Sequence, residues 1–147
     1  FVRVRAFNHS LGSCGVGVFG TERLCKQFGR RPPESLSGAP FLMPSSGTAL
    51  RRSIEQWLLE NEIPVRTIGE FDDTALMKVF AESHFGFVPA PMAIENEIRQ
   101  QFDLHCVCEI QNAKEEFYAI TVERRLRHPA IVAISDAARQ ELFGNRE

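Results

Sequence analysis

Residues 69–80 read Gly-Glu-Phe-Asp-Asp-Thr-Ala-Leu-Met-Lys-Val-Phe, and residues 86–91 read Gly-Phe-Val-Pro-Ala-Pro. This pattern predicts a strand, a helix opened by Asp72 or Asp73, and a second strand. Such βαβ units place helix N-termini and the carboxyl ends of strands along one edge of a sheet, where small ligands bind in open α/β folds. The stretch therefore favours a protein that senses a ligand over one that catalyses a reaction.

The composition limits the class of protein. The chain has 147 residues, of which 44% are hydrophobic and 24% are charged, which is typical of one globular domain. A formal net charge of -2 and dispersed arginine pairs argue against nucleic-acid binding by this chain alone. No window approaches the roughly 18 apolar residues of a membrane span, and no signal-peptide core follows Phe1, so we expect a cytoplasmic protein without membrane contact. Because the chain begins with Phe1, we also expect an upstream portion to be missing.

The cysteines and histidines form no recognisable metal or redox motif. Cys106 and Cys108 lie in an apolar, strand-like run without a CxxC pair, and we expect all four cysteines to be reduced core residues. Cys14 follows Gly12-Ser13 and could be imagined as a nucleophile, but no acid or amide partner stands at a recognisable spacing. Phosphate-loop, dinucleotide and nucleophile-elbow motifs are also lacking. We therefore expect no enzyme, no metal and no cofactor.

Predicted strands and helices alternate along the chain. Strands are expected at residues 2–7, 14–19, 39–43, 65–71, 85–88, 104–110 and 117–122. Helices are expected between most of them and at the end, with Pro91 as a first helical position. Their inward-facing residues are Leu24, Cys25 and Phe28; Leu50, Ile54, Trp57 and Leu58; Leu76, Val79 and Phe80; Ile94, Ile98 and Phe102; Ile131, Ile134, Ala138 and Leu142. This order predicts an α/β sandwich with a mixed sheet.

Two predicted helix starts carry polar side chains, and we expect both to border one cleft. The candidate effector-binding residues lie at these starts and at the strand between them: Ser45, Ser46, Thr48, Phe71, Asp72, Asp73, Thr74, Phe87, Val88 and Pro89. In this interpretation residues 87–89 form the mouth of the cleft. The alternative is that Ser46 and Asp72 only cap their helices.

The sign of the effector's charge stays open from the residues alone. Helix N-termini favour anions, so the turn at residues 44–48 suits a carboxylate or a phosphate. Glu70, Asp72 and Asp73 instead add negative charge, which suits a hard cation bound by oxygens.

Several motifs occur in an order that carries a family resemblance. Phe41-Leu42-Met43-Pro44 leads into Gly47-x-x-Leu50-Arg51-Arg52, Trp57 follows, and the next strand ends in Gly86-Phe87-Val88-x-x-Pro91. The chain resembles the effector-binding region of LysR-type transcriptional regulators, and His128-Pro129-Ala130 fits its return segment. The resemblance implies a mixed-sheet three-layer sandwich like that of type II periplasmic solute-binding proteins. It also implies a small-molecule or ion effector, homo-oligomers, and DNA binding only through a separate N-terminal domain.

The resemblance further implies a domain organisation. Residues 1–147 would be a fragment of the effector-binding domain, with 21–116 as the second subdomain. Residues 1–20 and 117–147 would be hinge strands and a segment of the first subdomain, and the N-terminal winged helix-turn-helix would be absent. Within this family, residues 4–9, 69–78 and 117–129 are similar to activators of a sodium/proton antiporter gene, which implies that sodium or lithium is the sensed signal, either directly or indirectly. A solute-binding module of a transport or signalling system, or a pure dimerisation domain, remains an alternative.

Overall fold

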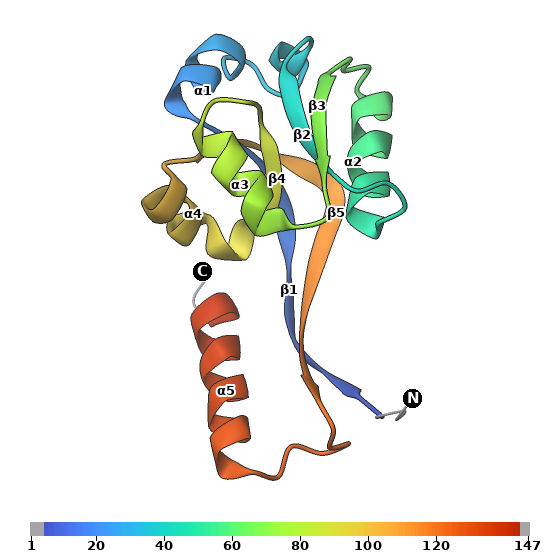
Figure 1. The fold of residues 1–147 in the computed structure, drawn as a ribbon, viewed down its shortest axis with the longest axis vertical. Coiled ribbons are helices and arrows are strands. Elements are labelled where there is room, and N and C mark those ends of the chain that lie inside the picture. Colours follow the sequence, from blue (N-terminus) through green and yellow to red (C-terminus); the bar gives the residue numbers. More distant parts are fainter. Residues whose placement is uncertain (1–4, 145–147) are drawn as a thin grey trace. The chain divides into compact units, whose positions relative to one another are not determined.

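The computed structural model describes residues 5–144 and divides into two compact units. One unit consists of residues 15–114, and the other combines residues 1–14 with residues 115–147. The helices and strands are labelled in Figure 1. Two long strands, β1 (Phe7–Gly20) and β5 (His105–Thr121), contribute residues to both units. All of the candidate effector residues belong to the unit of residues 15–114.

A mixed sheet forms the middle layer of the unit of residues 15–114. β2 (Pro40–Pro44) pairs in parallel with β3 (Arg66–Phe71). β4 (Val88–Pro91) pairs antiparallel with β1, which is also hydrogen-bonded to β5. A parallel bridge between Phe41 and Phe87 joins the two sets of strands. The parallel register of β2 and β3 places Pro44 opposite Phe71, at the ends of the two strands where the candidate residues begin.

Helices cover both faces of this sheet. α1 (Glu22–Phe28) and α2 (Ala49–Glu60) pack on one face, and α3 (Thr74–Glu82) and α4 (Glu95–Phe102) pack on the other. Alternate residues of β2 enter the two cores because successive side chains of a strand point to opposite faces. The core under α1 and α2 includes Leu24, Phe41, Met43, Ile54, Trp57 and Phe87, and the core under α3 and α4 includes Phe19, Leu42, Met77, Ala81 and Ile98. The predicted three-layer α/β sandwich is confirmed.

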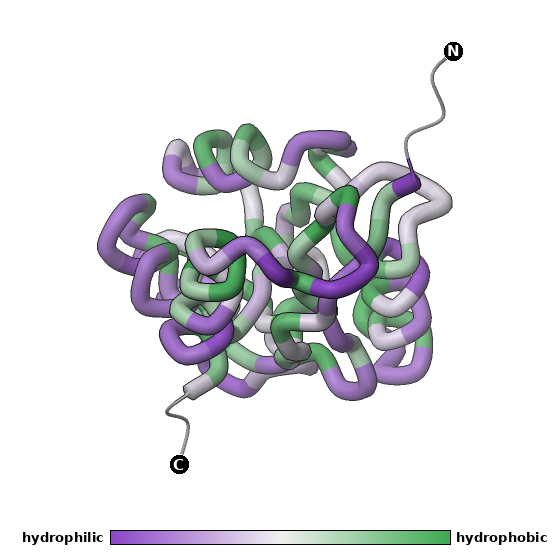
Figure 2. Tube along the Cα trace, turned by 90° about the horizontal axis from the view of Figure 1, so that it is seen from below, coloured by the Kyte–Doolittle hydropathy of each residue, from purple (hydrophilic) through white to green (hydrophobic). Residues whose placement is uncertain are grey.

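The helices themselves are amphipathic, and two short turns complete the unit. Figure 2 shows hydrophobic and hydrophilic residues following one another along the helical trace. Of the four predicted inward residues of α2, Ile54, Trp57 and Leu58 are buried and Leu50 is half-buried against the same core. 3-10 turns occur at η1 (Glu34–Leu36) and η2 (Met92–Ile94). No helix within residues 5–144 has the length and apolar character needed to cross a membrane.

The predicted inward face of α3 is wrong. Leu76, Val79 and Phe80 are between 40% and 49% exposed, whereas Met77 and Ala81 are fully buried. Both stripes are apolar, so the helical period alone could not decide between them. The ring of Phe80 instead packs against those of Phe71 and Phe85, with centroid distances of 5.3 and 5.6 Å.

The strand boundaries also differ from the prediction in three places. The part of the first predicted strand at residues 2–4 lies outside the described residues, and residues 7–20 form one strand rather than two. Residues 104–110 and 117–122 are likewise joined in the single strand β5, whose middle is mostly polar, with Ala113 buried in the core. Pro91 ends β4 rather than opening a helix, and α4 begins only at Glu95.

The second unit contains β1 residues 7–14, β5 residues 115–121 and α5 (Pro129–Phe143). The rings of Phe117 and Phe143 meet at 5.6 Å, and a Cβ on Gly12 would lie 2.7 Å from the Phe143 ring, so only glycine fits there. Ser135 is the buried residue of α5. Ile131 and Ile134 are 36% and 68% exposed, so the predicted inward positions of these two residues are wrong. Ala138 and Leu142, the other two predicted inward residues, are half-buried.

Candidate functional site

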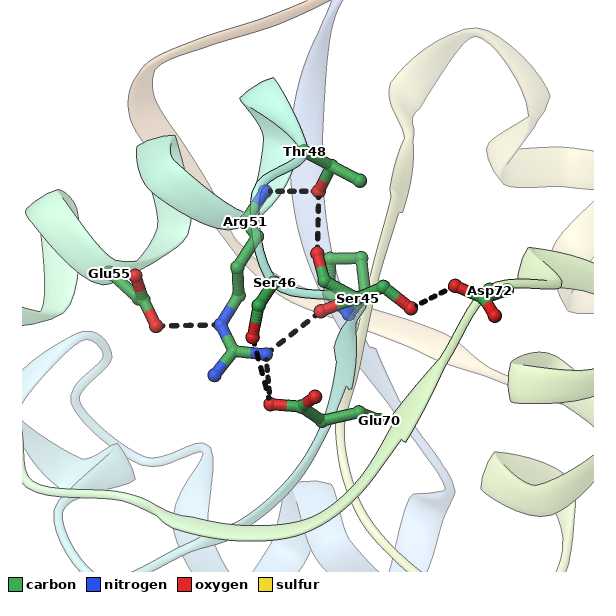
Figure 3. Close-up of polar contacts among 8 residues, drawn as sticks. Ser45, Ser46, Thr48, Arg51, Glu55, Glu70 and Asp72 are labelled. Atoms are coloured by element: carbon green, nitrogen blue, oxygen red, sulfur yellow. Dashed lines mark hydrogen bonds and ion pairs between the residues drawn. The ribbon is translucent and has the colours of Figure 1, made fainter.

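The structure brings the two predicted helix starts together. The Ser45 hydroxyl, in the loop between β2 and α2, donates a hydrogen bond to Oδ1 of Asp72, in the loop between β3 and α3 (Figure 3). The Ser45 backbone N–H also donates to the carbonyl of Phe71 at 3.0 Å. Parallel pairing of β2 with β3 explains this closeness, because the two strands end at the same edge of the sheet.

Two other residues cap the helices. The Thr48 hydroxyl accepts the backbone N–H of Arg51 at 3.1 Å, and Asp73 Oδ1 accepts the N–H groups of Ala75 and Leu76 at 2.8 and 3.3 Å. The interpretation that Ser46 and Asp72 only cap their helices is therefore wrong. Both side chains are turned toward the neighbouring strand or loop instead.

Arg51 connects these loops to the strands behind them. Its Nη1 donates to the Pro44 carbonyl and to Glu70 Oε1, both at 2.9 Å, and its Nε donates to Glu55 Oε1 at 2.7 Å (Figure 3). The Ser46 hydroxyl also donates to Glu70 Oε1, at 3.4 Å. One guanidinium thus holds α2, the end of β2 and the end of β3 in a fixed relation.

The environment of Arg51 favours its charged form. Burial lowers the pKa of the guanidinium, but hydrogen bonds and charges from Glu55 and Glu70 outweigh it, so the pKa is raised above its usual value. The Arg51 side chain is only 11% exposed, and that of Glu70 is 48% exposed. Sequence reasoning missed Arg51 as part of the site. The i,i+4 spacing to Glu55 was visible, but the pairing with Glu70 depends on strand register.

The remaining candidate residues are in three different settings. Phe71 is half-buried against Phe80, and Thr74 is the exposed first residue of α3. Phe87, Val88 and Pro89 are buried, with Phe87 and Val88 at 0% exposure, so they do not form the mouth of a cleft. The ring of Phe87 packs against those of Phe28 and Phe41, as expected of a core residue.

In the β2–α2 loop, residues 45–48, every side-chain hydroxyl donates its hydrogen to an acceptor within the protein. Ser45 donates to Asp72, Ser46 to Glu70, and Thr48 to the Ser45 carbonyl at 3.0 Å. A hydroxyl has one hydrogen and two lone pairs, so these groups keep acceptor oxygens for a ligand. Within residues 5–144, no group of three or more His, Cys, Asp or Glu side chains is arranged to hold a metal ion. Any bound ion would therefore rely on hydroxyl or backbone oxygens besides the carboxylates.

A surface groove lies beside the Arg51 network. It encloses about 550 Å³ between α2 and the strand β3. Its lining combines Arg51 and Glu55 with a largely apolar set of residues: Met43, Leu58, Leu59, Glu62, Ile63, Pro64, Val65 and Thr67. Sequence reasoning predicted this region only as the end of a helix and the start of a strand.

The four cysteines are free thiols. All four are half-buried, rather than fully buried as expected of core residues. Burial raises the pKa of Cys106 to about 11, with a further contribution from the charges of Glu95 and Glu109. Burial and the neighbouring Cys106 raise the pKa of Cys108 to about 12. Thiolates, which are the reactive form, are therefore scarce at these two positions near neutral pH.

Comparison with known proteins gives a consistent family. A family model described as LysR substrate binding domain matches residues 18–143. The chain is 30% identical over 142 residues to the transcriptional activator protein NhaR of Escherichia coli (strain K12), and the same values hold for NhaR of Shigella flexneri. These alignments cover 93% of this chain and 44% of each relative, so the chain spans less than half the length of the relatives.

Solved structures show the same fold at lower sequence identity. A transcriptional regulator from Vibrio parahaemolyticus superposes with a TM-score of 0.68 at 15% identity, covering 96% of this chain and 68% of that chain. The effector domain of AmpR from Pseudomonas aeruginosa superposes with a TM-score of 0.65 at 16% identity, covering 93% of this chain and 64% of that chain. At such identities the likeness concerns the fold alone.

Proposed function

The chain belongs to the LysR substrate-binding domain family, whose members are transcriptional regulators and not enzymes, and from this premise we propose where it senses its effector. The site is the contact between the β2–α2 loop, residues 45–48, and the β3–α3 loop, residues 71–74. The observation that carries this proposal is the hydrogen bond from Ser45 to Asp72, which joins the two loops. A ligand bound to both loops would stabilise the arrangement that this bond holds.

The proposed effector is sodium or lithium. The chemistry of the site supports a cation. The Ser45 and Ser46 hydroxyls donate their hydrogens to carboxylates, so only their oxygen lone pairs remain available to a ligand. Hard cations bind to such oxygens. Asp72 is the carboxylate best suited to an ion, since Asp73 caps α3 and Glu70 is paired with Arg51. The similarity of residues 69–78 to activators of a sodium/proton antiporter gene supports the same choice.

The wider role is also a proposal, because the chain spans less than half of its curated relatives. We propose that the whole protein is a cytoplasmic, homo-oligomeric activator that binds DNA through a domain outside residues 1–147. Sensing by this chain would then change how that domain acts on DNA. The relative NhaR, a transcriptional activator, supports this assignment over a transport module.

Backbone amide NMR tests the proposal with the chain as it stands. Sodium, lithium and potassium chlorides are titrated separately, with choline chloride keeping the ionic strength constant. The proposal predicts saturable shifts for sodium or lithium in the amides of residues 45–48 and 71–74, with weaker shifts for potassium. Equal, non-saturating shifts for all three salts, or selective shifts confined to other residues, would contradict it.

A further inference from the structure

The side chain of Arg51 reaches the residue in front of each candidate loop. Pro44, whose carbonyl accepts from Nη1, directly precedes Ser45. Glu70, whose carboxylate accepts from the same Nη1, directly precedes Phe71 and Asp72. The Ser45–Asp72 contact therefore lies immediately beyond two points that a single guanidinium holds (Figure 3).

We propose that Arg51 is the positioning residue of the effector site, a role that rests on the proposed function of the two loops. Arg51 holds the ends of β2 and β3 so that Ser45 and Asp72 face each other before any ligand arrives. It also orients Glu70, which in turn accepts the Ser46 hydroxyl. The guanidinium does not itself need to touch the effector.

The geometry at position 51 requires the shape of an arginine side chain and not only its positive charge. The planar guanidinium directs separate N–H groups toward Glu55 on one side and toward Pro44 and Glu70 on the other. A lysine ammonium keeps the charge but lacks this fixed fork, so it cannot hold the three acceptors in the same arrangement. Substitution by lysine therefore separates the positioning role from the charge.

A role of Arg51 through its charge alone predicts a different effect on cation binding from the positioning role. Arg51 offsets part of the negative charge of Glu55 and Glu70, so its loss would increase the attraction of the site for a cation. If Arg51 acted only through its charge, Arg51→Lys would leave cation binding unchanged and Arg51→Met would tighten it. The positioning role predicts that both substitutions weaken binding.

Arg52 provides a matched control on the same helix. It is exposed, and its Nη1 donates to one acceptor, the Gly47 carbonyl, at 2.7 Å. It does not contact β3 in any hydrogen bond or ion pair that the structure shows among residues 5–144. Gly47 belongs to the β2–α2 loop, so Arg52→Lys makes the same chemical change at a residue that contacts this loop but does not link it to β3.

The experiment compares wild type, Arg51→Lys, Arg51→Met and Arg52→Lys in the sodium titration by amide NMR, at a temperature where all four are folded. The expected result is a sodium midpoint raised by about tenfold or more in both Arg51 variants, equivalent to the loss of one well-formed charged interaction. Arg52→Lys should stay within about twofold of wild type. A wild-type midpoint in Arg51→Lys, or a lowered midpoint in Arg51→Met, would overturn the inference.

A second measurement tests the positioning role of Arg51 independently of which effector binds. Without added salt, hydrogen exchange is measured at the Ser45 amide, which donates to Phe71 across the two loops. The inference predicts faster exchange there in Arg51→Lys, with unchanged exchange at the buried residues Val18 and Val88. If wild type binds no salt selectively, the proposed effector fails while faster exchange still supports positioning. Unchanged exchange at Ser45 would overturn the positioning role itself.

Discussion

The hydroxyl of Ser45 donates a hydrogen bond to the carboxylate of Asp72, 27 positions later in the chain. The contact exists because β2 and β3 run parallel and end side by side. Each strand is followed by a loop that leads into a helix. Ser45 is half-buried and Asp72 is exposed, so the pair lies at the surface where a ligand can reach it.

Asp73 should contribute to stability as a helix cap. Its carboxylate accepts two backbone N–H groups at the start of α3, so Asp73→Ala should lower the free energy of unfolding by about 1 kcal/mol. Asp73→Ser should lose much less, because serine also caps helices well. Urea unfolding followed by circular dichroism measures both. Equal losses in the two variants would argue against a capping role.

Phe87 should behave as a core residue and not as a ligand contact. It is fully buried against the rings of Phe28 and Phe41, so Phe87→Ala should lower the free energy of unfolding by about 3–5 kcal/mol. Phe85 is 51% exposed, and Phe85→Ala should cost less than about 1 kcal/mol. Chemical denaturation of both variants provides the comparison. Similar costs at the two positions would contradict the burial of Phe87.

The cysteine thiols should make the fold less stable at alkaline pH. Burial raises the pKa of Cys106 to about 11 and that of Cys108 to about 12, from an ordinary value of 9.0. As the pH rises above 9, the unfolded chain loses these protons first, so the unfolded state gains stability relative to the folded state. The free energy of unfolding should therefore fall between about pH 9 and pH 12. Urea unfolding at a series of pH values, with Cys108→Ala for comparison, measures the slope.

The raised pKa values of Cys106 and Cys108 should also slow the alkylation of their thiols. In the folded chain at pH 8, Cys106 and Cys108 should react slowly with iodoacetamide, because the thiolate is the nucleophile. In urea both should react at the ordinary rate of an exposed cysteine. Peptide mass spectrometry reads each position separately. Rapid folded-state labelling of Cys106 and Cys108 at pH 8 would contradict the raised pKa values.

The layers of the fold could be predicted because several helices carry one clear apolar stripe. In α2, Ile54, Trp57 and Leu58 share a face, and the structure buries that face. α3 has two neighbouring apolar stripes, one with residues 76 and 80 and the other with residues 77 and 81. The helical period of the sequence therefore could not show which stripe is buried. In β5, the middle residues 111–116 are polar apart from the buried Ala113, so a hydrophobic pattern could not detect that one strand runs through them.

The two loops of the candidate site could be predicted from the sequence, but the Arg51 contacts that hold them could not. Ser45 and Asp72 were recognisable as residues at helix starts, and the parallel strands bring them together. Arg51 was not, because its contact with Glu70 spans 19 positions and depends on the register of β2 and β3. The burial of Phe87 was also missed, since strand residues next to a site and residues of a core look alike in sequence.

Calorimetric titration of wild type, Ser45→Ala and Asp72→Asn with sodium, lithium and potassium chlorides at matched ionic strength tests the central claim most directly. The account predicts a saturable heat of binding for sodium or lithium in wild type, a clearly weaker one in Ser45→Ala, and none in Asp72→Asn. Potassium should give no saturable signal in any of the three proteins. A selective sodium or lithium signal that is the same in wild type and Asp72→Asn would contradict the site, and no selective signal in wild type would contradict ion sensing by this chain.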